Sequence, residues 1–143
     1  MIEVASIKRG IVIDHITAGK GLLIFNKLNL ASLGYPVVLL MNVPSGRMGK
    51  KDIIKIENFV DVDTAMLGLI DSSITVNVIE SEHVTNKVRV SIPQEVKGLF
   101  TCSNPRCVTN TDSYVMPSFR LHDKKSCSYS CEYCEEITRV NLA

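Results

Sequence analysis

Four cysteines near the C-terminal end of the sequence form two close pairs, a spacing that is typical of a closed zinc site. Cys102 and Cys107 make a C-x4-C pair, Cys131 and Cys134 make a C-x2-C pair, and 23 residues separate the two pairs. A tight turn lets each pair direct two thiolates at one ion, and two pairs complete the tetrahedron that zinc prefers. No ligand position is left for water or substrate, so the predicted zinc is structural rather than catalytic.

Two other uses of these cysteines are disulfides and a thioredoxin-like redox pair at Cys131-Glu-Tyr-Cys134. The number of cysteines, five, is odd, so they cannot all pair as disulfides within the chain. The N-terminus has no basic-then-apolar signal peptide, and no apolar stretch approaches the length of a membrane span, which is about 20 residues. We therefore expect a cytoplasmic chain with reduced thiols, which favours the metal. Cys127 could pair with Cys131 as C-x3-C, but C-x2-C is the commoner geometry, so Cys127 is predicted to lie outside the ligand set.

Length and charge limit the remaining possibilities. A net charge of +1 with 22% charged residues argues against a nucleic-acid binder driven by electrostatics. A tail of about 45 residues is small enough to need its metal as part of its core. The segment 91–98 contains a proline and a glycine and lies just before the first cysteine, so we predict two domains, residues 1–95 and residues 96–143. The second is predicted to be a small all-β domain built around zinc.

The first 90 residues alternate between strand and helix patterns. Residues 37–43 and 51–57 are predicted to form a hairpin through a turn at Pro44-Ser45-Gly46. The predicted order is β-α-β-β-α-β with a possible extra edge strand, which is the ferredoxin-like α+β arrangement, with two helices on one face of an antiparallel sheet. The strands are expected at residues 11–16, 37–43, 51–57, 74–78 and 84–90, and the helices at residues 21–33 and directly after a capping Asp63.

A search for catalytic residues finds none. The sequence has three histidines and no Ser-His-acid set at a recognisable spacing. The glycine-lysine segments 18–21 and 46–51 do not complete the phosphate-loop pattern and are predicted to be turns. A zinc deaminase would need an open metal position and an H-x-E context, and neither is found. We therefore expect a chain that is not an enzyme.

Five polar residues interrupt the apolar strand patterns. Lysines on neighbouring strands can converge on a polyanion, while an imidazole adds a donor and a carboxylate accepts from hydroxyls. The alternative is that all five face water on the open side of a half-buried sheet, and the pattern alone favours this solvated face. The five residues are Asp14, His15, Lys55, Asn77 and Lys87.

Three segments of the sequence, in the same order, resemble the family of aspartate carbamoyltransferase regulatory chains. They are residues 6–16, residues 42–58 and the cysteine frame with Cys131-Glu-Tyr-Cys134, and the resemblance extends over essentially the whole chain. It implies a non-catalytic subunit of pyrimidine biosynthesis that forms a regulatory dimer. Its N-terminal domain would bind CTP, UTP or ATP, and its zinc domain would dock on the catalytic chain.

The same resemblance implies a nucleotide pocket and replaces the solvated-face interpretation. Lys87 and His15 would contact phosphates, Asp14 and Lys55 would contact the ribose and nearby base atoms, and apolar residues would form the walls. The full set is Ile7, Val12, Asp14, His15, Lys55, Asn77, Ile79, Val84 and Lys87.

This chain differs from the family pattern in two places. Glu82 stands where the family carries a tyrosine, between the matched Ile79 and Val84, and the N-terminal extension is shorter. Both differences bear on which nucleotide is preferred and on whether a second nucleotide binds with a metal ion. A nucleic-acid-binding zinc ribbon has a similar cysteine frame, but the near-neutral charge and the 6% aromatic content count against it. We therefore expect neither a nucleic acid nor a membrane as partner.

Overall fold

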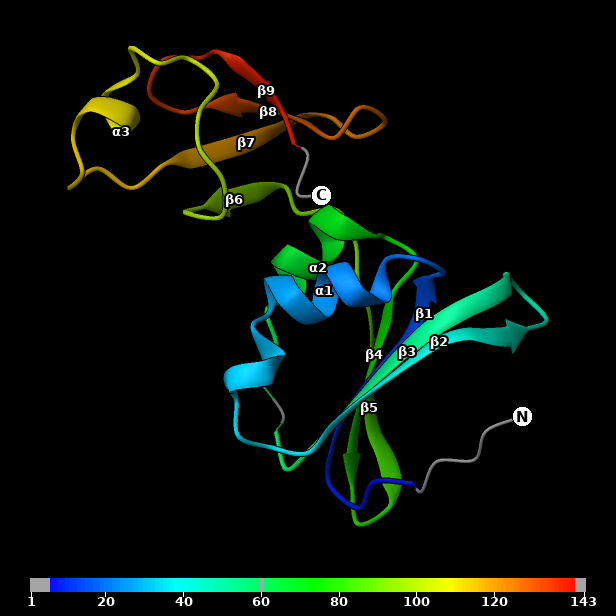
Figure 1. Ribbon diagram of the computed structural model, residues 1–143. Coiled ribbons are helices and arrows are strands. Elements are labelled where there is room, and N and C mark those ends of the chain that lie inside the picture. The colour runs from blue at the N-terminus through cyan, green and yellow to red at the C-terminus, as the bar shows by residue number, and fades with distance from the viewer. Residues whose placement is uncertain (1–5, 60, 141–143) are drawn as a thin grey trace. The chain divides into compact units, whose positions relative to one another are not determined.

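The structure is a computed structural model that describes residues 6–59 and 61–140. The chain divides into two compact units, residues 1–90 and residues 91–143 (Figure 1). The predicted difference in the N-terminal extension falls on residues 1–5 and so lies outside the described residues.

The first unit is an antiparallel sheet whose five strands follow the order β2-β3-β1-β4-β5. Two short helices, α1 (Gly21–Lys27) and α2 (Thr64–Ile70), cover one face of it (Figure 1). This is the predicted ferredoxin-like α+β arrangement, with β5 as the extra edge strand. The strands are β1 (Gly10–Thr17), β2 (Val37–Ser45), β3 (Gly49–Glu57), β4 (Thr75–Glu80) and β5 (His83–Arg89).

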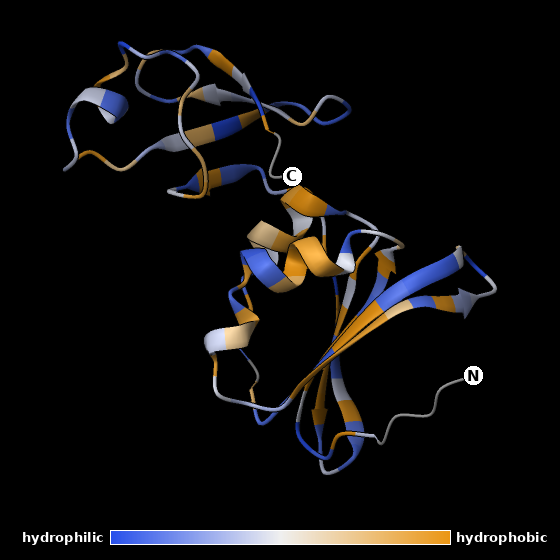
Figure 2. Ribbon diagram, in the orientation of Figure 1, coloured by the Kyte–Doolittle hydropathy of each residue, from blue (hydrophilic) through white to orange (hydrophobic). Residues whose placement is uncertain are grey.

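Alternation along the two central strands separates a buried face from an open face. Ile11 and Ile13 of β1 and Ile54 and Ile56 of β3 are fully buried on the face that the helices cover. Each such side chain contributes about 1.5–3 kcal/mol by leaving water. Their alternate neighbours are half-buried and lie on the face without helices, which makes that face accessible to a ligand. Figure 2 shows the apolar helices and the polar end of β3 beside the β2–β3 turn.

The helix predicted over residues 21–33 is wrong in length. α1 ends at Lys27, Asn29 adopts a left-handed conformation with φ 53°, and Leu30–Ser32 forms a separate 3₁₀ turn. Asparagine tolerates this conformation better than most residues. The break turns Leu30 into the core, where it is 3% exposed. A continuous helix could not bury residues that are scattered around its circumference in this way.

The hairpin turn also lies at a different position from the one predicted. Pro44 and Ser45 continue β2 by pairing with β3, so the hairpin turn lies at residues 46–48 rather than 44–46. Val84, which was predicted in the strand over residues 84–90, is 57% exposed, because β5 is an edge strand whose residues are mostly exposed. In contrast, α2 begins as predicted: the Asp63 carboxylate accepts hydrogen bonds from the Ala65 and Met66 amides at 3.0 and 3.1 Å.

A buried carboxylate connects the hairpin to the start of α1. Asp52 is fully buried, and its oxygens accept hydrogen bonds from the backbone amides of Gly19 (3.1 Å), Gly21 (2.9 Å) and Asn42 (3.0 Å). A buried carboxylate is tolerated only when such donors satisfy it. Gly21 packs so closely that an added Cβ would lie 2.7 Å from Asp52 Oδ2. Asp52 therefore fixes the end of the sheet on which the polar residues of β1 lie.

The second unit is a four-stranded antiparallel sheet in the order β6-β7-β8-β9, with one turn of helix, α3 (Val108–Thr111). Phe119 and Tyr129 are its largest fully buried side chains, and Phe100 stacks on Phe119 with 4.2 Å between ring centroids. Apart from the single helical turn, this is the predicted all-β domain. Its strands are β6 (Glu95–Lys97), β7 (Ser118–Asp123), β8 (Ser128–Cys131) and β9 (Ile137–Arg139).

Candidate metal centre and open sheet face

The four paired cysteines of the second unit converge on one point. The sulfur atoms of Cys102, Cys107, Cys131 and Cys134 all lie within 4.8 Å of one another. The Cys102 and Cys134 sulfurs are 3.6 Å apart, and those of Cys107 and Cys131 are 3.7 Å apart. A tetrahedral zinc with Zn–S bonds of about 2.3 Å requires sulfurs about 3.8 Å apart, whereas a disulfide requires about 2.05 Å. The donor set therefore fits a single tetrahedral ion.

Local hydrogen bonds orient these sulfurs. The Thr109 hydroxyl donates to the Cys107 sulfur at 3.1 Å, and the Asn104 amide approaches the Cys102 sulfur at 3.5 Å. The Asn110 side chain donates to the carbonyls of Cys102 and Asn104, which closes the loop that carries the first cysteine. Such outer contacts fix the direction of metal ligands and offset part of the negative charge of four thiolates.

The second pair, Cys131 and Cys134, lies at the connection between β8 and β9. Cys131 ends β8, and Cys134 lies in the turn before β9. The Glu135 amide donates to the Cys131 carbonyl at 2.9 Å, and Glu135 itself is left-handed with φ 67°. Cys127 is half-buried and is not one of the four clustered cysteines. The tertiary structure thus joins the two pairs that the sequence spacing selects.

Burial raises the pKa of two of these thiols when no metal is bound, which keeps them protonated. It raises the pKa of Cys102 to about 12 and also raises the pKa of Cys131. The hydrogen bond from Thr109 instead lowers the pKa of Cys107 to about 7. Since a metal ion binds thiolates, protons must leave on binding, and the metal affinity of this cluster falls as the pH falls.

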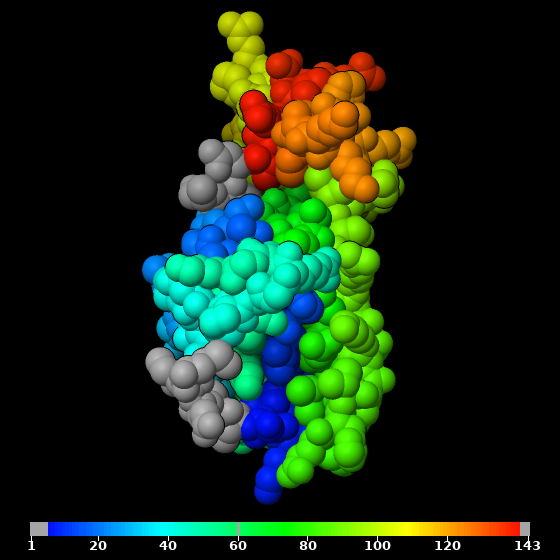
Figure 3. All heavy atoms as spheres, turned by 90° about the vertical axis from the view of Figure 1, so that its right-hand side faces the viewer, coloured from blue at the N-terminus to red at the C-terminus, as the bar shows by residue number. Residues whose placement is uncertain are grey.

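On the first unit, strand pairing aligns four of the predicted pocket residues in one row. Val12 of β1 pairs with Lys55 of β3 on one side and with Asn77 of β4 on the other, and Asn77 pairs with Lys87 of β5. Directly paired residues point to the same side of a sheet. The row lies on the face opposite the helices, which Figure 3 shows with β1 in blue, the β2–β3 hairpin in cyan and β4–β5 in green.

Rows on either side of this line contain more of the predicted residues. Toward one end, Ile79 of β4 pairs with Val84 of β5. Toward the other end, Asp14 pairs with Thr75, and Thr75 pairs with Arg89. The open face therefore has apolar residues at one end, two lysines and an asparagine beside Val12 in the middle, and Asp14, Thr75 and Arg89 at the other end. The sequence predicted Val12, Asp14, Lys55, Asn77, Ile79, Val84 and Lys87 for this site.

Ile7 and Glu82 lie at the end of the sheet where β1 begins and where β4 turns into β5. Ile7 precedes β1 and is 8% exposed. The Lys8 carbonyl accepts a hydrogen bond from the Glu82 amide at 3.0 Å, which holds the segment before β1 against the turn between β4 and β5. Ser81 and Glu82 are both left-handed, with φ 51° and 69°, as a two-residue hairpin turn requires. The exposed Glu82 side chain belongs to this turn.

A bulge in β1 directs His15 onto the open face. His15 has φ 58°, and the register of β1 against β3 shifts at this point. The Asp14 carboxylate accepts from the His15 amide at 2.6 Å and from Lys51 Nζ at 2.9 Å. The Ser73 hydroxyl donates to the His15 carbonyl at 3.0 Å, and His15 Nδ1 lies 3.1 Å from the Thr75 hydroxyl. These four contacts stabilise an unusual backbone conformation and fix the ring.

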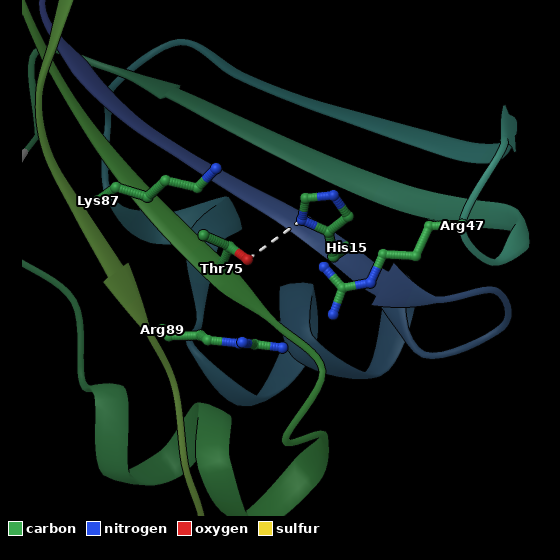
Figure 4. Close-up of a pocket in the computed structure, with 5 residues that line it drawn as sticks. All are labelled: His15, Arg47, Thr75, Lys87 and Arg89. Carbon is green, nitrogen blue, oxygen red and sulfur yellow. Dashed lines mark hydrogen bonds between the residues drawn. The ribbon is translucent and has the colours of Figure 1, made fainter.

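The bulge lines one side of a cationic pocket. The cavity has a volume of about 310 Å³ and is lined by His15, Arg47, Thr75, Lys87 and Arg89 (Figure 4). The five lining residues include three cations, an imidazole and a hydroxyl but no carboxylate. The sequence prediction contained His15 and Lys87 and missed the others. Arg89 lies two residues after Lys87 and Thr75 lies two residues before Asn77, so each shares a face with a predicted residue and strand period could have identified both. No sequence signal marked Arg47.

Electrostatics set the protonation of the pocket. Burial lowers the pKa of His15, and Lys51, Arg47 and Lys87 lower it further, while Asp14 opposes them. The pKa of Asp14 is lowered although burial by itself would raise it, because Lys51 and the His15 amide donate to its carboxylate. The pocket therefore combines a neutral imidazole with fixed cations, an arrangement that attracts an anion.

One polar atom of the central row is left without a partner. Asn77 Oδ1 is buried and has no hydrogen-bond partner among the described residues. A buried carbonyl oxygen without a donor costs about 1–3 kcal/mol. A bound molecule with a hydroxyl or an amino group beside Val12 would recover that energy.

None of the helices among the described residues is long and apolar enough to cross a membrane.

Comparisons with known proteins cover both units. The family model described as "Aspartate carbamoyltransferase regulatory chain, allosteric domain" matches residues 2–91, and the one described as "Aspartate carbamoyltransferase regulatory chain, metal binding domain" matches residues 94–141. Relatives named aspartate carbamoyltransferase regulatory chain match nearly the whole chain, and three of them serve as examples. The one from Clostridium acetobutylicum is 50% identical over 137 residues, which are 96% of this chain and 94% of the relative. The one from Clostridium tetani is 49% identical over 141 residues, 98% of each chain, and the one from Nitrosopumilus maritimus is 42% identical over 141 residues, 96% of this chain and 92% of the relative.

An allosteric domain followed by a four-cysteine metal-binding domain defines a regulatory subunit, a class of protein that is not itself catalytic. Both domain matches and the near full-length relatives name the same enzyme, aspartate carbamoyltransferase. The chain belongs to the family of aspartate carbamoyltransferase regulatory chains.

Proposed function

We propose that this chain senses nucleoside triphosphates on the open sheet face and transmits their binding to the catalytic chain of aspartate carbamoyltransferase. In this proposal residues 1–95 bind CTP, UTP or ATP, and residues 96–143 hold a structural zinc and dock on the catalytic chain. The observation that carries it is the polar row of β3, β1, β4 and β5 ending in a cationic pocket of about 310 Å³.

The composition of the open face supports one orientation for the nucleotide. Phosphates would lie at Lys87 and His15, where the pocket contains no carboxylate. The ribose and base would lie across the central row, within reach of Lys55 and Asp14, where the unpartnered Asn77 Oδ1 can accept from a hydroxyl or amino group. Ile7, Val12, Ile79 and Val84 would supply apolar contacts, since a base offers two apolar faces.

Zinc is the metal that best suits the cysteine cluster. Four thiolates in a tetrahedron favour zinc or an iron–sulfur centre, and the pattern C-x4-C with C-x2-C is common among structural zinc sites. Cys102, Cys107, Cys131 and Cys134 would all be ligands, which leaves no position for substrate. The ion would cross-link the loop before α3 to the end of β8 and so stabilise a domain whose largest fully buried side chains are Phe119 and Tyr129.

Exposed apolar side chains support the proposed contacts with other chains. Tyr114, Met116 and Tyr133 of the second unit are 96%, 61% and 52% exposed, a combination typical of a protein interface. On the first unit, Met41 is 50% exposed on the edge strand β2, which suits pairing with a second copy in a regulatory dimer. We place the assembly in the cytoplasm, because five unpaired cysteines suit a reducing compartment.

Reconstitution with a catalytic subunit tests the proposal. The zinc-loaded chain would be mixed with catalytic subunits, and carbamoyl transfer to aspartate would be followed against CTP, UTP and ATP, with catalytic subunits alone as the control. Allosteric coupling of about 1–3 kcal/mol shifts substrate affinity by about 5- to 150-fold. Failure to associate would refute the subunit role, and association without any nucleotide effect would refute the allosteric role alone.

A further inference from the structure

Arg47 reaches the open face from the turn between β2 and β3, outside the strands that carry the other pocket residues. The turn at residues 46–48 is held by a hydrogen bond from the Met48 amide to the Ser45 hydroxyl at 3.2 Å, and Gly49 follows it with φ 75°. In Figure 4 the Arg47 guanidinium lies beside the His15 ring and points into the pocket. No hydrogen bond or ion pair of Arg47 occurs within residues 6–59 and 61–140, so the guanidinium is available to a ligand.

Arg47 enters the pocket from the side opposite to β5. Lys87 and Arg89 enter from β5, whereas Arg47 comes from the β2–β3 turn, and its guanidinium lies beside the His15 ring (Figure 4). An anion at His15 would therefore be contacted by cations from two sides. A guanidinium presents two parallel donors to a phosphate, which gives it more geometric selectivity than an ammonium group has.

The sequence of groups along β4 indicates which part of a nucleotide lies at Arg47. β4 rises by about 3.3 Å per residue, so Ile79 at the apolar end and Thr75 at the cationic end are about 13 Å apart. A nucleotide with its base near Ile79 would pass Lys87, which is paired with Asn77 in the middle of the strand, before reaching Thr75. Only the end of a phosphate chain would then extend to the side of the pocket that Arg47 forms.

We propose that Arg47 binds the terminal phosphate of the nucleotide and thereby selects triphosphates over monophosphates. The inference rests on the proposed nucleotide site and adds a specificity-determining residue to it. Because Arg47 is exposed, its contact is weaker than that of a buried charge pair. The expected loss of CTP affinity on removing it is about 5- to 30-fold.

The test is calorimetric titration of the full zinc-loaded chain with CTP, CMP and inorganic tripolyphosphate. Arg47→Ala should weaken CTP and tripolyphosphate by the same factor and change CMP by less than about 2-fold, while Arg47→Lys should be intermediate because it keeps the charge and loses the paired donors. Lys50→Ala is the matched control, because it removes one positive charge from the same hairpin. Lys50 is adjacent to Lys51 in β3 and therefore lies on the opposite face of the strand, away from the pocket. It should affect the three ligands equally and weakly.

The outcomes separate this inference from the proposed function. Unchanged CTP affinity in Arg47→Ala, or an equal loss for CTP and CMP, overturns the role at the terminal phosphate while nucleotide binding itself stands. A loss for CTP with unchanged tripolyphosphate would move Arg47 to the base or ribose and overturns the inference as well. If the unsubstituted chain binds no CTP, the proposed function fails together with it.

Discussion

Replacing one cysteine of the metal cluster, with the neighbouring Cys127 as control, is the most direct test of the metal centre. Cys131→Ser removes a buried sulfur that lies 3.7 Å from the Cys107 sulfur, whereas Cys127→Ser removes a half-buried thiol outside the cluster. Structural zinc contributes about 10–16 kcal/mol to a small domain, or roughly 2.5–4 kcal/mol for each of four ligands. Cys131→Ser should therefore weaken zinc binding by about 60- to 700-fold, because 1.4 kcal/mol is a factor of ten.

The loss of zinc affinity should appear as a loss of stability in the second unit. Zinc would be measured by metal analysis after dialysis against a chelator of known affinity, and unfolding would be followed through Tyr129, which is fully buried in that unit. Cys127→Ser should retain one zinc per chain and unfold like the unsubstituted protein. Cys131→Ser should lose the ion and the tyrosine transition, while the five-stranded sheet of the first unit should remain folded.

Two results would refute this reasoning. Retention of zinc by Cys131→Ser together with its loss in Cys127→Ser would mean that the C-x3-C pairing supplies the ligands. A second unit that keeps its cooperative unfolding transition after the metal is removed would mean that Phe119, Tyr129 and their neighbours suffice as a core. In that case the metal would not be structural in the sense proposed here.

Three further predictions concern the first unit. Lys87→Ala should weaken CTP binding by about 10- to 150-fold at low salt and by less at high salt, as measured by calorimetry, and unchanged affinity would place the nucleotide elsewhere. The pKa of His15 lies below 6.5 in the free pocket, and bound phosphates should raise it; binding then takes up a proton, so CTP affinity should increase as the pH falls below about 6.5. His15→Asn should remove this part of the pH dependence, and asparagine tolerates the left-handed backbone at this position. A pH profile that the substitution leaves unchanged would contradict the assignment of His15 to the phosphates. Gly21→Ala should lower the free energy of unfolding by about 1–3 kcal/mol in urea titrations, because its Cβ would lie 2.7 Å from Asp52 Oδ2, whereas Gly46→Ala, which has nothing within 4 Å, should have little effect.

Local patterns in the sequence were sufficient for the type and order of the main elements and for the composition of the metal cluster. The cysteine spacing selected the four residues whose sulfurs lie together, since each pair is set by a turn of a few residues. Asp63 marked the start of α2, and the β-branched runs marked the strands, because strand and cap signals depend on neighbouring residues only. The helix over residues 21–33 was predicted too long because no local signal showed that Asn29 would turn left-handed.

The polar site depended on tertiary structure. Strand period shows that Lys87 and Arg89 share a face, but it does not show that Lys87 aligns with Asn77, because register is set by turns and bulges elsewhere in the sheet. The bulge that directs His15 into the pocket requires contacts from Lys51 and Ser73, which are far away in the sequence.

Arg47 is the extreme case. Its own neighbours indicate only a turn, and it becomes a pocket residue because the β2–β3 hairpin carries it across the sheet toward β1. The sequence by itself therefore determined which residue types the chain holds in each strand and turn, together with the metal cluster whose pairs are local. The tertiary structure alone decided which cations surround one cavity, because the distances between separate strands follow from pairing and packing and not from spacing along the chain.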